Sequence, residues 1–278
     1  MDLQKIQLIQ TKSYLTKSKL PESDYVINPY VGCTHGCKYC YAEFMKRFTG
    51  HTENWGEFLD VKLCNNKIDD KKINGKTIFL SSVTDCYNPF EKKYEITRKI
   101  LKELIDIDCI VHISTKSKLI LRDIDILKRL PNLKVAISLN TLDENFRKDM
   151  DRASSINERM DTLRELHKNG IYTVLFMSPI FPKITEWKPI VQTTNNFVDE
   201  YWFENLNLRG SYKNRIFNYI KENYGQYYDL YKEIYIDHNK EYWEKLADDI
   251  TSYCDEKDIR YKNYFEHKKL VEEKQGRV

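Results

Sequence analysis

Apolar runs alternate with amphipathic segments through most of this 278-residue chain. Six apolar, β-branched runs predict strands, at residues 24–32, 76–85, 109–117, 133–141, 172–182 and 199–208. Helical spacing of apolar residues predicts helices between them, over residues 95–107, 121–130 and 155–170. This alternation is typical of a parallel sheet with helices on its outside. Because a closed barrel of this kind has eight units, the six here predict an α/β fold, a partial TIM-type (β/α)6 barrel.

The helix expected over residues 155–170 has recognisable ends. Ser154 or Ser155 fits the N-cap, and Glu158 stands in the capping-box position. Gly170 fits the C-terminal cap, where a left-handed residue often ends a helix.

After about residue 206 the pattern changes to charged segments that predict helices, with a last strand expected over residues 259–267. No long linker and no internal repeat separates these segments from the barrel. We expect three regions: an N-terminal extension (1–24), the barrel (25–208) and a helical C-terminal region packed on it (209–278).

Charge, hydropathy and cysteine usage exclude some classes of protein. Lys and Arg number 45 and Asp and Glu 42, a balance that does not indicate nucleic-acid binding by bulk charge. No run of about 18 apolar residues predicts a membrane span, and residues 1–15 lack the apolar core of a signal peptide. Seven cysteines, an odd number, do not suit a secreted disulfide framework. We therefore expect a cytoplasmic protein with no membrane partner.

Three of the cysteines stand close together, in the segment GCTHGCKYCYA (32–42). Cys33, Cys37 and Cys40 provide three thiolates, one fewer than a structural zinc site requires. Three cysteines can instead ligate three irons of a [4Fe–4S] cluster and leave the fourth iron open. Gly32 and Gly36 allow the backbone to fold tightly round such a cluster.

A zinc site remains an alternative to the cluster. It would need a fourth ligand, for which the candidates are His35, His51 and Cys64. In the cluster interpretation, His35 is expected to be an exposed loop residue.

Polar or small residues follow several of the expected strands. They are Ser82, Thr84, Asp85, Thr115, Lys116, Ser117, Ser138, Asn140 and Ser178. In parallel α/β folds, ligands bind at the carboxyl ends of the strands. We therefore expect these side chains and the cysteine loop to surround one site.

These residues resemble those of a known family. C-x3-C-x2-C, with an aromatic residue before the last cysteine, is the signature of the radical S-adenosylmethionine (SAM) superfamily. The segments NPYVGCTHGCKYCYA, SSVTDCYNPFEKKYEITRKIL, TKSKLILRDIDIL and SPIFP resemble its spore photoproduct lyase-like branch. The resemblance covers about residues 25–182. It implies an enzyme that binds a [4Fe–4S] cluster and SAM, cleaves SAM reductively, and abstracts hydrogen from a substrate with the 5′-deoxyadenosyl radical.

The resemblance also implies roles for the loop residues. Cys33, Cys37 and Cys40 would ligate the cluster. Tyr39 would lie near the adenine of SAM, and Tyr41 at the boundary between SAM and the substrate.

Residues after the second and third strands would bind the methionine part of SAM. Ser82, Thr84 and Asp85 would accept hydrogen bonds from its amino group. Lys116 would pair with a carboxylate or with the negative charge of the cluster. Alternatively, Asp85 could have only a structural role in a turn, where aspartate is common.

Later segments would complete the SAM site. Ser138 and Asn140 would reach the ribose hydroxyls or the carboxylate. Arg152 could also pair with the carboxylate, because a guanidinium matches it bidentately. Ser178 would bring backbone groups to the adenine edge.

The sequence departs from the photoproduct lyases near the end of the second strand. Those enzymes carry a hydrogen-donating cysteine there, whereas this chain has Ser82 or Val83. Cys86 is the candidate donor, and it also fits a small buried apolar residue. Cys254 is isolated in the C-terminal region, so we expect a single cluster.

The substrate stays open at this point: nucleic acid, peptide and metabolite all fit. Besides a general radical SAM enzyme, the alternatives are a DNA-lesion lyase of the photoproduct type and a zinc-containing nucleic-acid-binding module. Arg209, Lys213, Arg215 and Lys221 fit either a nucleic-acid surface or a helix that covers the barrel. An enzyme of this kind would need a reductant such as flavodoxin or ferredoxin.

Overall fold

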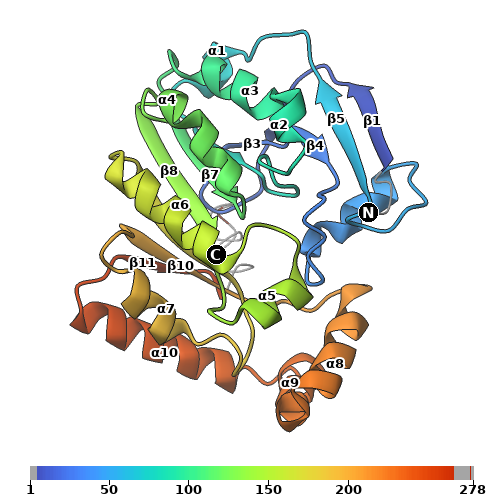
Figure 1. Ribbon diagram of the computed structural model, residues 1–278, viewed down its shortest axis with the longest axis vertical. Coiled ribbons are helices and arrows are strands. Elements are labelled where there is room, and N and C mark those ends of the chain that lie inside the picture. The colour runs from blue at the N-terminus through green and yellow to red at the C-terminus, as the bar shows by residue number, and fades with distance from the viewer. Residues whose placement is uncertain (1–4, 266–275, 277–278) are drawn as a thin grey trace.

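The computed structural model describes residues 5–265 and residue 276 (Figure 1). Its main sheet has the strand order β11-β10-β9-β8-β7-β6-β3-β2. The strands are β2 (Leu15–Lys17), β3 (Tyr25–Ile27), β6 (Thr77–Leu80), β7 (Ile110–Thr115), β8 (Asn132–Ser138), β9 (Tyr172–Ile180), β10 (Glu200–Asn205) and β11 (Tyr261–Asn263). Neighbours from β3 to β11 are parallel, and β2 is antiparallel to β3.

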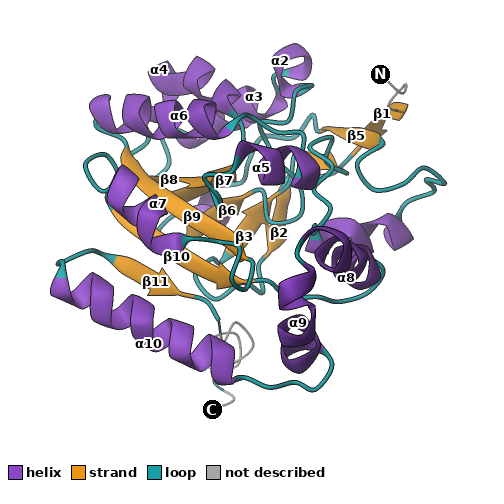
Figure 2. Ribbon diagram, turned by 60° about the horizontal axis from the view of Figure 1, so that its bottom comes forward, coloured by secondary structure: helices purple, strands orange, loops and turns teal. Residues whose placement is uncertain are grey.

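Five of the six predicted strands are confirmed as β6, β7, β8, β9 and β10, and the one expected over residues 24–32 is split into β3 in this sheet and β4 (Tyr30–Val31) in a second sheet. The curved sheet ends at β2 on one side and β11 on the other, and within the described residues these two strands do not pair (Figure 2). The partial barrel is therefore confirmed. Of the last strand expected over residues 259–267, the structure shows β11, while residues 266 and 267 lie outside the described part.

Alternation along each strand separates the core from the barrel interior. In β7, Val111 and Ile113 are fully buried in the hydrophobic core. His112 and Ser114, which point to the other face, line a cavity inside the barrel. The same strands therefore supply both the packing surface for the helices and the lining of the interior.

Helices cover the outer face of the sheet, with α3, α4 and α6 side by side in Figure 2. They are α3 (Ile96–Leu104), α4 (Ile124–Leu127), α6 (Ile156–Lys168) and α7 (Trp187–Thr194). The Ser155–Glu158 capping box is confirmed at the start of α6, and Gly170 has φ +74° just beyond its end.

Some short elements were not predicted. The segment expected as one helix over residues 121–130 is split into the 3-10 helix η2 (Lys118–Asp123) and α4. The other unpredicted helices before residue 209 are α1 (Asp70–Ile73), α2 (Glu91–Tyr94), α5 (Glu144–Met150), α7 (Trp187–Thr194) and the 3-10 helix η1 (Tyr41–Phe48).

A second sheet lies beside the barrel and was also not predicted. It has the order β1-β5-β4, with β1 (Lys5–Gln10) parallel to β5 (Phe58–Leu63) and β4 (Tyr30–Val31) antiparallel to it. The expected N-terminal extension thus contributes a strand to this sheet. Because β4 leads directly into the cysteine segment, the second sheet supports the start of that loop.

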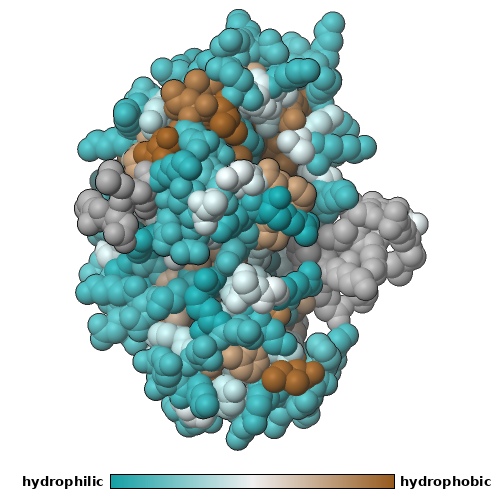
Figure 3. Space-filling view, turned by 90° about the vertical axis from the view of Figure 1, so that its right-hand side faces the viewer, coloured by the Kyte–Doolittle hydropathy of each residue, from teal (hydrophilic) through white to brown (hydrophobic). Residues whose placement is uncertain are grey.

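The C-terminal region is helical, as predicted. Its elements are α8 (Tyr212–Asn223), the 3-10 helix η3 (Gly225–Tyr227), α9 (Tyr228–Tyr235) and α10 (Glu241–Glu256). Among the described residues, no helix has the length and apolar character needed to cross a membrane. The face of the molecule in Figure 3 is mostly hydrophilic, with separate hydrophobic groups between.

Candidate active site

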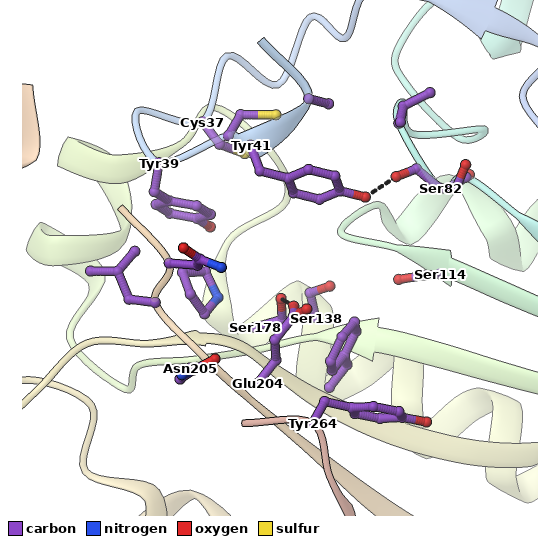
Figure 4. Close-up of a pocket in the computed structure, with 18 of the residues that line it drawn as sticks. Cys37, Tyr39, Tyr41, Ser82, Ser114, Ser138, Ser178, Glu204, Asn205 and Tyr264 are labelled. Carbon is purple, nitrogen blue, oxygen red and sulfur yellow. Dashed lines mark hydrogen bonds between the residues drawn. The ribbon is translucent and has the colours of Figure 1, made fainter. Parts of the chain in front are cut away.

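A large cavity lies at the carboxyl ends of the barrel strands, with a volume of about 2240 Å³. Most of the predicted site residues line it: Cys33, Cys37, Tyr39, Cys40, Tyr41, Ser82, Thr84, Asp85, Lys116, Ser138 and Ser178. In Figure 4, the cysteine loop with Tyr39 and Tyr41 faces Ser178 and Glu204 across the cavity. The structure therefore brings the cysteine loop and the strand ends to one place.

Two glycines of the cysteine loop, residues 32–40, are closely approached, one by a backbone carbonyl and one by an arginine side chain. Gly32 has φ +86°, and a Cβ atom there would lie 2.5 Å from the carbonyl oxygen of Phe58. Gly36 has φ +57°, and its Cβ would lie 2.4 Å from Nη2 of Arg152. Both positions need glycine, as the sequence suggested.

A backbone clamp joins the same loop to the segment after α5. Lys38 N donates to Met150 O at 2.8 Å, and Arg152 N donates to His35 O at 2.8 Å. Since the clamp uses main-chain groups, it holds the loop against the barrel whatever the cavity contains.

The three thiols of the loop lie close enough to affect one another. Burial raises the pKa of the Cys33 thiol well above its ordinary value, and the neighbouring Asp85, Cys37 and Cys40 raise it further. Burial likewise raises the pKa of Cys37 to about 12. A metal cation that coordinates such thiols compensates for this cost, because a coordinating thiol gives up its proton.

Asp85 connects the cysteine loop to two strand ends. Its Oδ1 accepts hydrogen bonds from Thr115 Oγ1 at 2.7 Å and from Tyr87 N at 2.9 Å. Its Oδ2 accepts one from Lys116 N at 2.9 Å and lies 3.2 Å from Nε2 of His35. Burial raises the pKa of Asp85, but the neighbouring His35 and these hydrogen bonds outweigh burial and lower it to about 2.

His35 was expected to be exposed, and that prediction is wrong. Its side chain is 3% exposed and lies against the Asp85 carboxylate. Its Nε2 lies 3.2 Å from Asp85 Oδ2, an electrostatic contact, and neither ring nitrogen has a hydrogen-bond partner among the described residues. His35 therefore fixes the middle of the cysteine loop to the end of β6.

Tyr39 belongs to a buried network that the sequence did not reveal. Its hydroxyl donates to Asp151 Oδ2 at 3.3 Å, and its ring packs edge-on against Phe181. Asp151 Oδ1 pairs with Arg159 Nη2 at 2.5 Å, and Arg159 Nη1 donates to Ser138 O at 3.2 Å. The network links the cysteine loop, α6 and the end of β8.

The turn after β6 is held by hydrogen bonds to the residue that follows β3 and to the cysteine loop. Asn28, after β3, donates through Nδ2 to Ser82 Oγ at 2.9 Å and accepts from Val83 N at 3.1 Å. Thr84 Oγ1 donates to Gly32 O at 2.6 Å. The hydroxyl of Tyr41 donates to the carbonyl oxygen of Ser82 across the mouth of the cavity (Figure 4).

The wall opposite the cysteine loop combines polar groups with aromatic rings. Ser178 Oγ donates to Glu204 on β10 (Figure 4). Phe176, Trp202 and Tyr264 form a triad of rings with centroids 5.7 to 6.4 Å apart. Glu204, Trp202 and Tyr264 lie beyond residue 182, in the part of the chain that matched no motif, and Phe176 lies in a predicted strand without being singled out.

The geometry agrees with the comparison to known families. Residues 27–192 match the model of the radical SAM superfamily. The chain belongs to the radical SAM superfamily. It is 37% identical over 267 residues to an uncharacterised protein of Methanocaldococcus jannaschii, across 95% of this chain and 99% of that one.

Two further relatives are named for reactions or ligands of their own. The Radical SAM Nalpha-GlyT isomerase of Pseudomonas phage M6 is 29% identical over 166 residues, which are 56% of this radical SAM protein and 33% of the isomerase. A spore photoproduct lyase variant, solved with AdoMet and dinucleoside spore photoproduct, shares the fold with a TM-score of 0.59 and 14% identity. That likeness covers 78% of this chain and 66% of the lyase.

As a member of this superfamily, the protein is an enzyme that uses a [4Fe–4S] cluster and SAM. Its cysteine loop fits the cluster, since the buried Cys33 and the half-buried Cys37 and Cys40 line one wall of the cavity. Thr34 Oγ1, beside Cys33, is buried and has no hydrogen-bond partner among the described residues. Within residues 5–265, no three potential ligand side chains converge on one metal ion; a cluster does not require this, because each thiolate would bind a different iron.

Three of the predicted site residues do not line the cavity of this radical SAM protein. Arg152 donates through Nη2 to Gly56 O at 2.9 Å and packs behind Gly36. Asn140 donates through Nδ2 to Pro179 O at 2.8 Å. Cys86 is fully buried behind the turn after β6, where its amide donates to Ser81 Oγ at 2.7 Å. Their contacts are those of residues that support the walls.

Proposed function

We propose that this radical SAM enzyme cleaves SAM reductively beside Cys33, Cys37 and Cys40 and abstracts hydrogen from a substrate bound in the same cavity. The observation that carries the proposal is the meeting of the three loop cysteines with the strand ends in one cavity of about 2240 Å³. Pockets for a single small ligand usually measure about 300–1,000 Å³, so this cavity has room for SAM and a substrate together. The cluster, when bound, supplies the electron that breaks the sulfonium C–S bond of SAM.

The chain's own residues would position SAM and exclude water. Lys116 is the cation best placed for a carboxylate, since its ammonium lies 5.8 Å from the Tyr39 ring and forms no ion pair with the described residues. Ser82, after β6, and Ser138, at the end of β8, would offer hydroxyls on either side of β7. Asp85 already accepts hydrogen bonds at both oxygens, so we assign it to holding the loop as well as to the SAM amino group.

The substrate would occupy the opposite wall. Glu204 and Ser178 provide acceptors there, and the aromatic triad provides apolar surface. His112, at the same depth, is a neutral imidazole at physiological pH, because burial and the nearby Lys134 lower its pKa to about 4. This wall suits a substrate with an apolar or planar part and at least one hydrogen-bond donor.

A lyase of the photoproduct type is a narrower form of this proposal. The fold similarity to spore photoproduct lyase favours it. Cys86, the candidate hydrogen donor, is fully buried outside the cavity lining, so the geometry favours the general reaction. Two of the basic residues of α8 are used within the protein, since Arg215 pairs with Glu43 and Lys213 donates to Tyr235 O, and this disfavours a nucleic-acid surface on that helix.

The enzyme would receive its electron from a carrier protein such as flavodoxin or ferredoxin, in the cytoplasm. The test of the function is anaerobic reconstitution. We expect brown protein with about four irons and four sulfides per chain, which releases 5′-deoxyadenosine from SAM when dithionite is added. Cys37→Ala should lose the cluster, whereas Cys109→Ala, at a buried cysteine outside the loop, should keep it. Colourless protein that holds stoichiometric zinc would overturn the proposal.

The role of Lys116 gives a second prediction. Lys116→Ala should weaken SAM binding to the cluster-loaded protein about 10- to 100-fold, because a hydrogen bond to a charged group contributes about 1.5–3 kcal/mol. The iron content should not change, since Lys116 is not a ligand. Anaerobic equilibrium dialysis measures the affinity.

Lys118→Ala is the matched control. Lys118 is exposed and pairs with Glu158, and its removal should leave the affinity unchanged. Equal affinities for the Lys116 and Lys118 variants would show that SAM lies elsewhere in the cavity.

A further inference from the structure

Trp55 donates a hydrogen bond to one of the three loop cysteines. Its indole Nε1 lies 3.3 Å from Sγ of Cys40, within the range for a bond to sulfur. Trp55 stands in the segment between η1 and β5, outside the cysteine motif. This contact could not be predicted from a local pattern, because the two residues are 15 positions apart in the chain.

The surrounding contacts fix the direction of the indole. The Trp55 ring packs edge-on against Phe58, with centroids 5.7 Å apart and planes at 84°. The next residue, Gly56, is in close contact with the cysteine loop. A Cβ atom on Gly56 would lie 2.8 Å from Gly36 Cα. Arg152 Nη2 donates to Gly56 O at 2.9 Å. The segment with Trp55 is therefore locked onto the loop, and the N–H is held toward the sulfur.

Hydrogen bonds to a ligand sulfur affect the reduction of an iron–sulfur cluster. Reduction adds negative charge to the irons and their sulfur ligands, and an N–H donor stabilises that charge. A donor at Cys40 Sγ thus favours the reduced state, and its loss makes reduction harder.

We propose that Trp55 is a positioning residue that raises the reduction potential of the cluster through Cys40. The inference rests on the proposed function, since it requires the cluster to be held by the loop. It assigns the indole N–H, and not the bulk of the ring, as the group responsible.

Trp55→Phe tests this assignment, because it keeps a ring against Phe58 and removes the donor. In an anaerobic redox titration followed by electron paramagnetic resonance, the midpoint potential of the variant should be more negative than that of the unmodified protein. Iron content should be equal in the two. Trp187→Phe is the control, since Trp187 packs against Phe203 and Tyr253, and its midpoint should not move.

A second measurement uses the unmodified sequence and does not depend on the folding of a variant. Protein labelled with indole-¹⁵N tryptophan should show weak coupling of one ¹⁵N nucleus to the reduced cluster. An unchanged midpoint in Trp55→Phe with full iron content, or the absence of that coupling, would overturn the inference. Failure of the unmodified protein to assemble any cluster would overturn the proposed function, and the inference with it.

Discussion

Replacing Asp151 with alanine should lower the free energy of unfolding by about 3–5 kcal/mol, because it leaves the guanidinium of Arg159 buried without its charge partner. The two side chains are 2% and 1% exposed, and their N–O distance is 2.5 Å. Asp151 also accepts from the Tyr39 hydroxyl and from Ala153 N. Denaturation of the anaerobic protein, followed by circular dichroism, measures the loss.

Two further variants test whether the loss of stability comes from the unpaired buried charge. Asp161→Ala breaks a pair with Arg164 whose side chains are 69% and 46% exposed, and it should change stability by about 0.5 kcal/mol or less. The double variant Asp151→Ala/Arg159→Met should be more stable than Asp151→Ala, since no unpaired charge is then buried. If Asp151→Ala lost no more free energy of unfolding than Asp161→Ala, the buried ion pair would not stabilise the fold.

The partial barrel follows from local signals in the sequence. Each barrel strand is an apolar run flanked by a helical period or a turn, and α6 even has its capping box in the sequence. The second sheet lacked such signals. β1 is largely exposed, β4 has two residues, and both are strands because β5, far along the chain, pairs with them. Pairing between segments this far apart in the sequence does not produce a local periodicity of apolar residues from which the strands could be predicted.

The candidate site, too, could be predicted from the sequence only in part. The strand ends predicted the cavity because parallel strands bring their carboxyl ends to one edge, and Lys116 and Ser138 lie there. Arg152 was predicted to pair with the SAM carboxylate because of its charge. Its guanidinium instead donates to the backbone behind the cysteine loop. His35 and Trp55 are polar partners chosen by tertiary packing, and residue type alone did not reveal that both are held against the cysteine loop.

Replacing Gly32 with alanine should destabilise the protein by about 2–6 kcal/mol. About 1–3 kcal/mol is expected from the φ of +86°, and a similar amount from overpacking against Phe58. The added Cβ would lie 2.5 Å from the Phe58 carbonyl oxygen, and β5 cannot retreat without breaking its pairing with β4. The displaced loop should also hold less iron, because Gly32 precedes Cys33 and its carbonyl accepts from Thr84.

Gly75→Ala distinguishes this crowding from backbone strain. Gly75 has φ +65°, and a Cβ there meets nothing within 4 Å, so the substitution should cost about 1–2 kcal/mol and leave the iron content unchanged. The comparison needs two measurements, denaturant unfolding and iron per chain after anaerobic reconstitution. The larger loss of stability and the loss of iron should occur together in Gly32→Ala alone. Equal losses in the two variants would mean that the approach of β5 does not shape the loop, since strain from a positive φ is common to both.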